Sequence, residues 1–360
     1  MVRVLNQQGI VPDFLCFQNR ISLQEIKKHY GAELQLRFVN IPEPKLPFEW
    51  NIVAFNILVS KYLKAYNWAI NSNNTAFGLK SPVPVLNYVH FPRKYRMRQL
   101  LRSVHFPEGP SKSLSDWAND PFKLLHFLYR FNQHIPKNET TWANSQFTAV
   151  CQEESYGIKP HQVVYPPVNE AEFPKSWQMG RALNTVVSLG RFSPDKRQLE
   201  QIELAKLCPE FQFHLVGFVN NKAYFDRCKQ AAEQTPNVVL HPNCEAQKRN
   251  ELLQAAGIFL HSLRNEPFGI TTAQALAEGC LPLVHNSGGQ KEVVALNNHR
   301  YENLEEARIK LQEISKLNHS EAAKRLEILQ KDLKSYSPTQ FHGHFLRELK
   351  RITELSHREV

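Results

Sequence analysis

The sequence predicts an α/β fold arranged in two domains, and three observations support this. The chain has 360 residues, enough for two domains of ordinary size, each with its own core. Short apolar runs of the length of a buried parallel strand, such as 183–189 and 257–261, alternate with segments whose apolar residues recur at helical spacing. A proline-rich stretch, 166–177, lies near the middle of the chain and is typical of a linker.

The composition is that of a globular protein, because 42% of the residues are hydrophobic and 22% are charged. No apolar run is long enough to cross a membrane, and the opening residues lack the apolar core of a signal peptide. The six cysteines are scattered without a Cys-x-x-Cys pair, which argues against a zinc module and fits reduced thiols. We therefore expect a cytoplasmic chain.

The chain is basic, with 44 Lys and Arg against 34 Asp and Glu and a net charge of +10. Such an excess fits a diphosphate substrate, an anionic membrane surface or nucleic acid. No aromatic-basic groove motif supports nucleic acid, so we expect no nucleic-acid partner. The basic segment 93–102 is interleaved with apolar residues, which suits peripheral contact with anionic headgroups, at the inner face of the membrane, as well as a solvated helix face.

In the first half, periodicity predicts βα units followed by a mostly helical stretch. Residues 2–9 resemble the end of a helix, and further helices are expected at 22–30, 52–66 and within 111–140. Strands are expected at 13–17 and 34–39, ending in 71–74, running into His90, and at 162–165. An isolated histidine at a strand end, such as His90, is most often a structural residue. Taken alone, the pattern therefore gives His90 no chemistry.

The second half continues the alternation of strands and helices. After strand 183–189, Ser193 can cap a helix that has Pro194 at its first position. Strands at 211–216 and 238–240 end at Gly217 and His241, and the loops at those carboxyl ends are where a doubly wound sheet binds a ligand. Helices follow to the end, the last of them around 341–352.

The stretch 261–292 forms one unit in this pattern. A turn at 266–269 leads into a helix over 271–278, where no breaker occurs and the apolar residues fall at three- and four-residue spacing. Gly279 stands where a left-handed cap would end this helix, and 281–284 suits a buried strand. The glycine pair 288–289 then allows backbone N–H groups to approach an anion. The same features would also fit an ordinary βαβ unit with an acidic loop.

Charged residues fall at the ends of the predicted strands. Arg191 and Lys196 could neutralise a diphosphate, although a pair of surface cations would have the same pattern. Glu266 could accept hydrogen bonds from sugar hydroxyls, with the N–H groups of residues 268–270 facing the same cavity. The histidines at 214, 241 and 261 fit no ligand spacing, so we expect neither a metal nor another cofactor.

The motif around Glu266 resembles that of the retaining GT-B glycosyltransferases of the fourth sequence family, the glycosyl transferases group 1. The matching residues are Glu266, Pro267, Phe268, Gly269, Gly279, Pro282, Gly288, Gly289 and Glu292. One position departs, because Gln274 stands where the family has a second Glu that usually holds the ribose hydroxyls of the nucleotide. A glutamine can still bond a diol through its amide, but it is a weaker partner than an anion.

Other elements extend the resemblance. They are Gly190-Arg191 with Lys196, Asn-Ser-x-Phe-Thr at 144–148, Tyr-Pro-Pro-Val at 165–168, and Tyr-Val-His-Phe-Pro around His90. The resemblance implies two Rossmann-like domains facing a cleft, 1–168 for the acceptor and 169–334 for the nucleotide-sugar, with a crossover helix in 335–360 returning to the first domain. The strand and Gly-Gly loop that open the family's first domain are not recognisable here, so we expect that βα unit to be missing or diverged.

The reaction implied by the resemblance is metal-independent hexose transfer with retention, by front-face displacement. Arg191 and Lys196 would carry the charge of the leaving diphosphate, Glu266 would grip the sugar, and His90 would orient it. The residues expected to bind the nucleotide-sugar are Gly190, Arg191, Lys196, Gly217, His241, Pro267, Phe268, Gly269, Ile270 and Gln274.

A UDP-sugar such as UDP-glucose is the favoured donor, with a glycan or lipid-linked acceptor in polysaccharide synthesis. GDP-mannose stays open, because the Tyr-Val-His-Phe-Pro and Leu-His-Pro-Asn stretches resemble mannosyltransferases of lipid-linked glycan assembly. The alternative is a nucleotide-sugar binding protein with little or no transferase activity, which Gln274 and the unrecognised Gly-Gly loop would suit.

Overall fold

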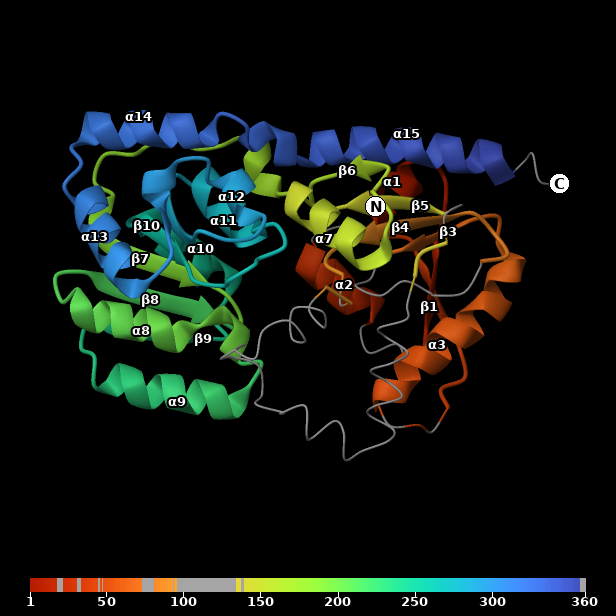
Figure 1. Ribbon diagram of the computed structural model, residues 1–360, viewed down its shortest axis with the longest axis horizontal. Coiled ribbons are helices and arrows are strands. Elements are labelled where there is room, and N and C mark those ends of the chain that lie inside the picture. Colours follow the sequence, from red (N-terminus) through yellow and green to blue (C-terminus); the bar gives the residue numbers. More distant parts are fainter. Residues whose placement is uncertain are drawn as a thin grey trace.

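The computed structural model describes residues 1–17, 22–30, 34–44, 46, 48–72, 81–92, 94–95, 134–136 and 139–356. Most of the basic segment 93–102 and of the helical stretch 111–140 lies outside them. The described residues form an α/β fold whose two larger sheets lie side by side, with the last two helices running along one edge (Figure 1). All strand pairs within the sheets are parallel.

The larger sheet has six strands in the order β12-β11-β10-β7-β8-β9. The strands are β7 Ala182–Leu189, β8 Gln212–Gly217, β9 Val238–Pro242, β10 Ala256–His261, β11 Leu281–His285 and β12 Arg300–Tyr301. From β7 the chain moves outward to β8 and β9, then returns to the other side of β7 and moves outward again through β10, β11 and β12. The order therefore reverses between β7 and β10, which is the point where such sheets bind ligands beyond their carboxyl ends.

Alternate residues of these strands pack on opposite faces of the sheet. Val186, Phe213 and Ile258 belong to one apolar cluster, while their neighbours Val187 and Phe259 belong to another. The helices of this half are α8 Gln198–Leu207, α9 Lys222–Glu233, α10 Ala246–Ala255, α11 Ile270–Ala277, α12 Gln290–Val293, α13 Leu304–Ser315 and α14 His319–Gln330. The first cluster includes residues of α8, α9 and α13 and the second includes residues of α10, so helices cover both faces.

The first half of the chain contains a two-stranded and a four-stranded sheet. The strands are β1 Asp13–Cys16 and β2 Arg37–Asn40 in the small sheet, and β3 Ala69–Asn71, β4 Val85–Val89, β5 Thr140–Ala143 and β6 Gln162–Val163 in the larger one. The described helices are α1 Val2–Gln7, α2 Leu23–Tyr30, α3 Phe48–Tyr62 and α7 Gln146–Tyr156. The predicted strands 34–39 and 162–165 are shorter than expected.

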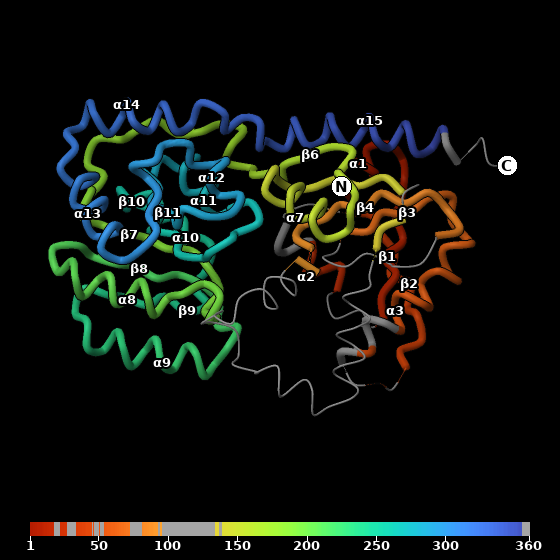
Figure 2. The backbone as a smooth tube through the Cα atoms, viewed as in Figure 1, coloured from red at the N-terminus to blue at the C-terminus, as the bar shows by residue number. Residues whose placement is uncertain are grey.

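The last helix, α15 Pro338–Ser356, completes the core of this first half. Its residues Phe341, Phe345, Leu349 and Ile352 recur every three or four positions and so form one apolar stripe. The stripe packs in one cluster with Val4 and Leu5 of α1 and with Leu86, Tyr88 and Trp142 of the sheet. Figure 2 shows α1 close beneath α15. The predicted return of the C-terminal helix to the first domain is confirmed, while the exact domain boundaries stay predictions.

Two further expectations concern the whole chain. All six cysteines are free, and four of them are buried. Among the described residues, no helix combines the length and apolar character needed to span a bilayer.

Three buried histidines of the second half should make the fold sensitive to acid. Burial lowers the pKa of His261, His285 and His299 from 6.5 to about 4. Between these values the unfolded chain binds more protons than the native one, so stability is full near neutral pH and falls as the pH drops from 6.5 towards 4. Each histidine should contribute about 1.4 kcal/mol per pH unit inside that window.

Urea denaturation at pH 7, 6 and 5 measures this slope. His299→Asn should lower the slope, because it removes one of the three protonation sites. Equal stability of the parental chain at pH 7 and pH 5 would contradict the prediction.

Candidate active site at the sheet reversal

Five of the predicted site residues lie in two loops where the strand order reverses. The loop after β7 carries Gly190, Arg191 and Lys196, and the loop after β10 carries Glu266 and Pro267. Because β7 and β10 are hydrogen-bonded neighbours, their carboxyl ends bring the two loops together. The signature residues thus meet although Lys196 and Glu266 are 70 positions apart in the sequence.

Lys196 and Glu266 form an ion pair that solvent barely reaches. The Lys196 Nζ lies 2.9 Å from Glu266 Oε2, with side-chain exposures of 19% and 16%. Burial alone would raise the pKa of Glu266, but the charge and hydrogen bond of Lys196 outweigh it and hold this pKa below its ordinary value. Glu266 is therefore an anion, fixed in orientation by its cation.

Two of the predicted glycines, Gly190 and Gly217, lie close to one another beside Lys196. A Cβ on Gly190 would lie 3.4 Å from the Lys196 side chain, and a Cβ on Gly217 would lie 1.9 Å from the carbonyl oxygen of Gly190. The end of β8 therefore passes directly against the loop that follows β7. Gly217 shapes the site by allowing this close approach of the backbone, whereas a Cβ on Gly190 would make only an ordinary van der Waals contact.

His261, at the end of β10, lies next to Glu266. Its Nε2 lies 3.5 Å from Glu266 Oε2, and its side chain is 3% exposed. Burial, reinforced by the charge of Lys196, lowers the pKa of His261 to about 4, so the imidazole is neutral at physiological pH. Sequence reasoning considered His261 only as a metal ligand. Its position at the carboxyl end of a buried strand could have indicated that it lies near the site.

The glycine pair packs against the turn instead of offering its second N–H to an anion. The Gly289 N–H donates to the carbonyl oxygen of Glu266 at 2.7 Å. A Cβ on Gly288 would lie 2.5 Å from that oxygen, and one on Gly289 would lie 2.1 Å from the Pro267 carbonyl oxygen. The expected anion contact is therefore wrong for Gly289, whose role is to enclose the backbone of the turn.

The N–H groups at the start of α11 are better placed to meet a ligand. Among the described residues, none accepts a hydrogen bond from the N–H of Phe268 or Gly269, and Ile270 begins the helix, where N–H groups lack an intrahelical acceptor. Gly269 has φ of 109°, which favours glycine. The Phe268 ring is buried against Tyr165 and Tyr336, so only the backbone of Phe268 can serve a ligand.

Arg191 pairs with a carboxylate outside the buried pair. Its Nη2 lies 3.0 Å from Asp195 Oδ2, and its side chain is 47% exposed. Its Nε donates to Ser193 Oγ, which donates in turn to the Arg191 carbonyl oxygen. The prediction that Ser193 caps a helix is therefore wrong, because its side chain makes no capping hydrogen bond. The segment forms a 3₁₀ turn, Pro194–Lys196, and Arg197 with φ of 59° separates it from α8.

The first domain reaches the same turn through the start of α7. Ser145 Oγ donates to the Pro267 carbonyl oxygen at 2.5 Å. The carboxylate of Glu292 accepts the N–H groups of Gln146 and Phe147, both at 2.9 Å, and the hydroxyl of Tyr165 at 3.1 Å. The predicted Asn-Ser-x-Phe-Thr element therefore joins the two halves of the site.

His90 follows β4 on this side of the molecule. Its Nε2 lies 2.9 Å from Ser72 Oγ, and burial lowers its pKa. Its carbonyl oxygen accepts from Thr148 Oγ1, and the Thr148 N–H donates to Ser145 Oγ. His90 is thus connected through α7 to the Pro267 turn. Its contact with a sugar stays a prediction.

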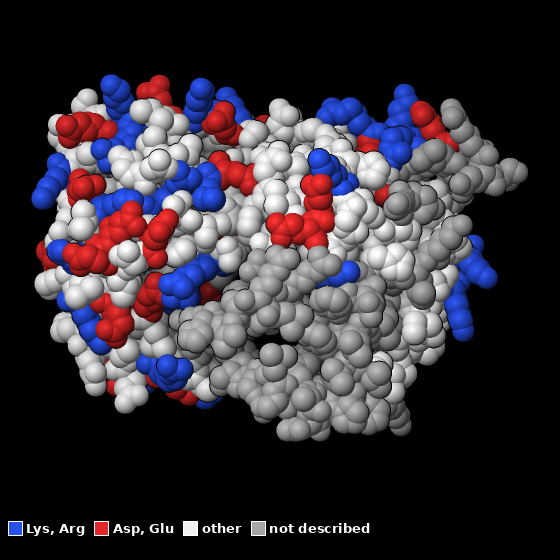
Figure 3. Space-filling model, in the orientation of Figure 1, with Lys and Arg blue, Asp and Glu red and all other residues white. Residues whose placement is uncertain are grey.

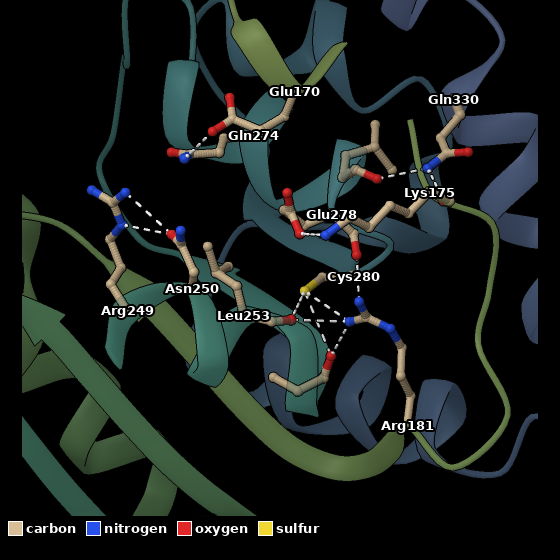
Figure 4. Close-up of polar contacts among 12 residues, drawn as sticks. Glu170, Lys175, Arg181, Arg249, Asn250, Leu253, Gln274, Glu278, Cys280 and Gln330 are labelled. Atoms are coloured by element: carbon tan, nitrogen blue, oxygen red, sulfur yellow. Dashed lines mark hydrogen bonds and ion pairs between the residues drawn. The ribbon is translucent and has the colours of Figure 1, made fainter. Parts of the chain in front are cut away.

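Two predicted nucleotide contacts have partners outside the buried pair. His241 lies inside edge strand β9, not in a loop, and its Nε2 is 3.0 Å from His214 Nδ1. Gln274 donates from its Nε2 to Glu170 Oε1 at 2.7 Å, as Figure 4 shows. No group of three or more His, Cys, Asp or Glu among the described residues could hold a metal ion.

Removing the cation alone should be more damaging than removing the pair. Lys196→Met leaves the Glu266 carboxylate buried without its partner, so we expect a loss of about 3 kcal/mol in the free energy of unfolding. Lys196→Met with Glu266→Gln removes both charges and should recover much of this loss. Urea denaturation of the two variants measures the coupling, and equal losses in both would contradict it.

Comparison with known proteins finds relatives among glycosyltransferases. The family model of the glycosyl transferases group 1 matches residues 150–324, just under half of the chain. A protein of Dictyostelium discoideum named GDP-Man:Man(3)GlcNAc(2)-PP-Dol alpha-1,2-mannosyltransferase is 28% identical over 317 residues, which cover 78% of this chain. The match spans 61% of that relative's length.

Solved structures share the fold over nearly the whole chain. A glycosyltransferase from Rickettsia africae has a TM-score of 0.66 and 17% identity, covering 98% of this chain and 92% of its own. Sucrose-phosphate synthase from Thermosynechococcus elongatus has a TM-score of 0.70 and 12% identity, covering 97% and 92%. At these identities the structures support the fold alone. The matched segment resembles the glycosyl transferases group 1, and the chain as a whole shares the GT-B fold of these solved structures.

Proposed function

We propose that this glycosyltransferase moves mannose from GDP-mannose to a lipid-linked glycan. The donor in this proposal differs from the UDP-glucose favoured by sequence reasoning, because the relative from Dictyostelium discoideum is named for GDP-mannose. The chain spans about three fifths of that relative, so the relative's activity supports the proposal without establishing it.

The observation that carries the proposal is the buried Lys196–Glu266 pair at the reversal between β7 and β10. Glu266 is ionised and oriented, so it can accept hydrogen bonds from the hydroxyls of the sugar. Phe268 and Gly269 lie two and three positions after Glu266 in the same turn. Their N–H groups have no acceptor among the described residues. A preorganised acceptor beside unpaired donors suits a sugar diphosphate better than an uncharged ligand.

Arg191 and Lys196 would stabilise the leaving group. As the bond between the anomeric carbon and the diphosphate oxygen breaks, negative charge grows on the diphosphate, and fixed cations lower the barrier. The exposed Arg191–Asp195 pair contributes little to stability, so the guanidinium can turn to a ligand at small cost. The ion pair with Glu266 holds the Lys196 side chain in place.

The stereochemical course in this proposal is retention without a metal. The acceptor hydroxyl oxygen bonds to the anomeric carbon on the face from which the diphosphate leaves, and the departing diphosphate oxygen takes the hydroxyl proton. His90, linked to the Pro267 turn through α7, would orient the sugar from the side of the first domain.

The lipid-linked acceptor would bring the protein to a membrane surface, as a peripheral contact. On the face shown in Figure 3, basic and acidic side chains alternate over the described residues and form no single basic patch there. That face therefore does not favour electrostatic attachment to anionic lipid.

The donor can be identified directly by calorimetry. We expect GDP and GDP-mannose to bind more tightly than UDP and UDP-glucose, with slow release of GDP from GDP-mannose. Tighter binding of UDP-glucose would overturn the donor assignment. Binding of GDP-mannose without release or transfer, even with lipid-linked glycan acceptors, would favour the nucleotide-sugar binding protein.

Arg191→Ala should lower the turnover of GDP-mannose by about a hundredfold or more, because a donor to the developing charge is lost. The matched control is Lys222→Ala, which breaks an exposed pair with Asp226 of the same four-residue spacing on α9. Transfer of mannose, or release of GDP, is measured for both. An Arg191→Ala protein with the parental rate would remove the leaving-group role.

A further inference from the structure

The segment that joins the two domains, residues 168–175, packs against α11. The N–H of Lys175 donates to the Ala277 carbonyl oxygen at 2.7 Å, and Lys175 Nζ lies 2.5 Å from Glu278 Oε2. At the other end of the segment, the Val168 N–H donates to the Tyr336 carbonyl oxygen at 2.8 Å. Figure 4 shows the Lys175–Glu278 and Glu170–Gln274 contacts, which join the segment to α11 and to its C-cap. The segment between these ties is therefore held in place.

Glu170 is the acidic residue of this segment that faces α11. It belongs to the 3₁₀ turn Asn169–Glu172, whose Ala171 is fully buried and fixes the turn. Gln274 lies four residues after Ile270, on the side of α11 that stays partly exposed, while Ala273 and Ala275 beside it are buried. The pair thus lies about 6 Å along the helix from the loop that carries Glu266.

The pair presents unused acceptors. Gln274 Nε2 donates to Glu170 Oε1, and among the described residues neither Glu170 Oε2 nor Gln274 Oε1 accepts a hydrogen bond. Both side chains are partly exposed. One anionic and one neutral acceptor therefore stand side by side, held in a fixed geometry and open to a ligand that carries two neighbouring hydroxyl groups.

We propose that Glu170 supplies the carboxylate that holds the ribose hydroxyls of the donor nucleotide, with Gln274 as its partner. This rests on the proposed function, which places a nucleoside diphosphate at the reversal of the sheet. An acidic side chain on the ribose diol is the usual solution in doubly wound nucleotide sites, because a carboxylate accepts stronger hydrogen bonds than an amide.

The same contact explains the glutamine at 274. A glutamate there would put two carboxylates within hydrogen-bond distance, and like charges at that distance cannot both stay ionised without cost. With Gln274 the site has one negative charge, carried by Glu170 of the interdomain segment. Compared with a glutamate at position 274, the negative charge lies on the interdomain segment and not on α11. The diol still meets two acceptor side chains.

The test compares each nucleotide with its analogue lacking the ribose hydroxyls. Calorimetry with GDP, UDP and their 2′,3′-dideoxy analogues is run on the parental chain and on Glu170→Gln. The parental chain should prefer the ribose form by about ten- to a hundredfold, as expected for hydrogen bonds to a charged group. Glu170→Gln should lose most of that preference, and Glu170→Gln with Gln274→Glu should regain it.

Glu172→Gln is the matched control, since the Glu172 carboxylate lies on the same 3₁₀ turn but accepts from Thr339 of α15. It should keep the parental preference. If Glu170→Gln weakens the ribose and dideoxy forms equally, or keeps the preference, Glu170 only ties the segment to α11 and the proposal is overturned, while GDP binding by the parental chain still supports the proposed function. A parental chain that binds neither GDP nor UDP would overturn both.

Discussion

The carboxylate of Glu292 joins the two halves of this molecule at the point where the site is built. The first N–H groups of a helix have no acceptor within the helix, and a negative charge there also suits the helix dipole. In α7 the side chain of Ser145 satisfies the Thr148 N–H, and Glu292 of the second domain satisfies those of Gln146 and Phe147. A helix of the first domain is thus capped by a carboxylate of the second.

The position of Glu266 depends on this joint. Ser145 also donates to the Pro267 carbonyl oxygen, one residue from Glu266, and the Gly289 N–H holds the carbonyl oxygen of Glu266 itself. Tyr165, Phe268 and Tyr336 pack against one another around the same turn. The Lys196–Glu266 pair gains little net stability from being buried, because desolvation offsets the attraction. What the pairing with Lys196 provides is a carboxylate that stays ionised in one orientation despite its burial.

Elements with a local signal could be predicted from the sequence. Strand 183–189, the cap at Gly279 and the stripe of the last helix each follow from residues that are neighbours in the chain. Lys196 and Glu266 were found because their motifs resemble those of a family, although their contact joins residues 70 positions apart. The glycine pair 288–289 shows the limit of such reasoning, since glycines leave room equally for an anion and for a neighbouring backbone.

The contacts that sequence reasoning missed are long-range and carry no periodicity. Gln274 and Glu170 are 104 residues apart, and nothing near Gln274 indicates that its partner is acidic. Once the two are seen together, the glutamine in the family's acidic position is no longer an isolated loss of charge. If Glu170 holds the ribose, the segment connecting the domains is itself part of the donor site. Donor binding and the geometry between Val168 and Lys175 would then depend on each other, because the ties that fix this segment to Tyr336 and Ala277 also fix the carboxylate.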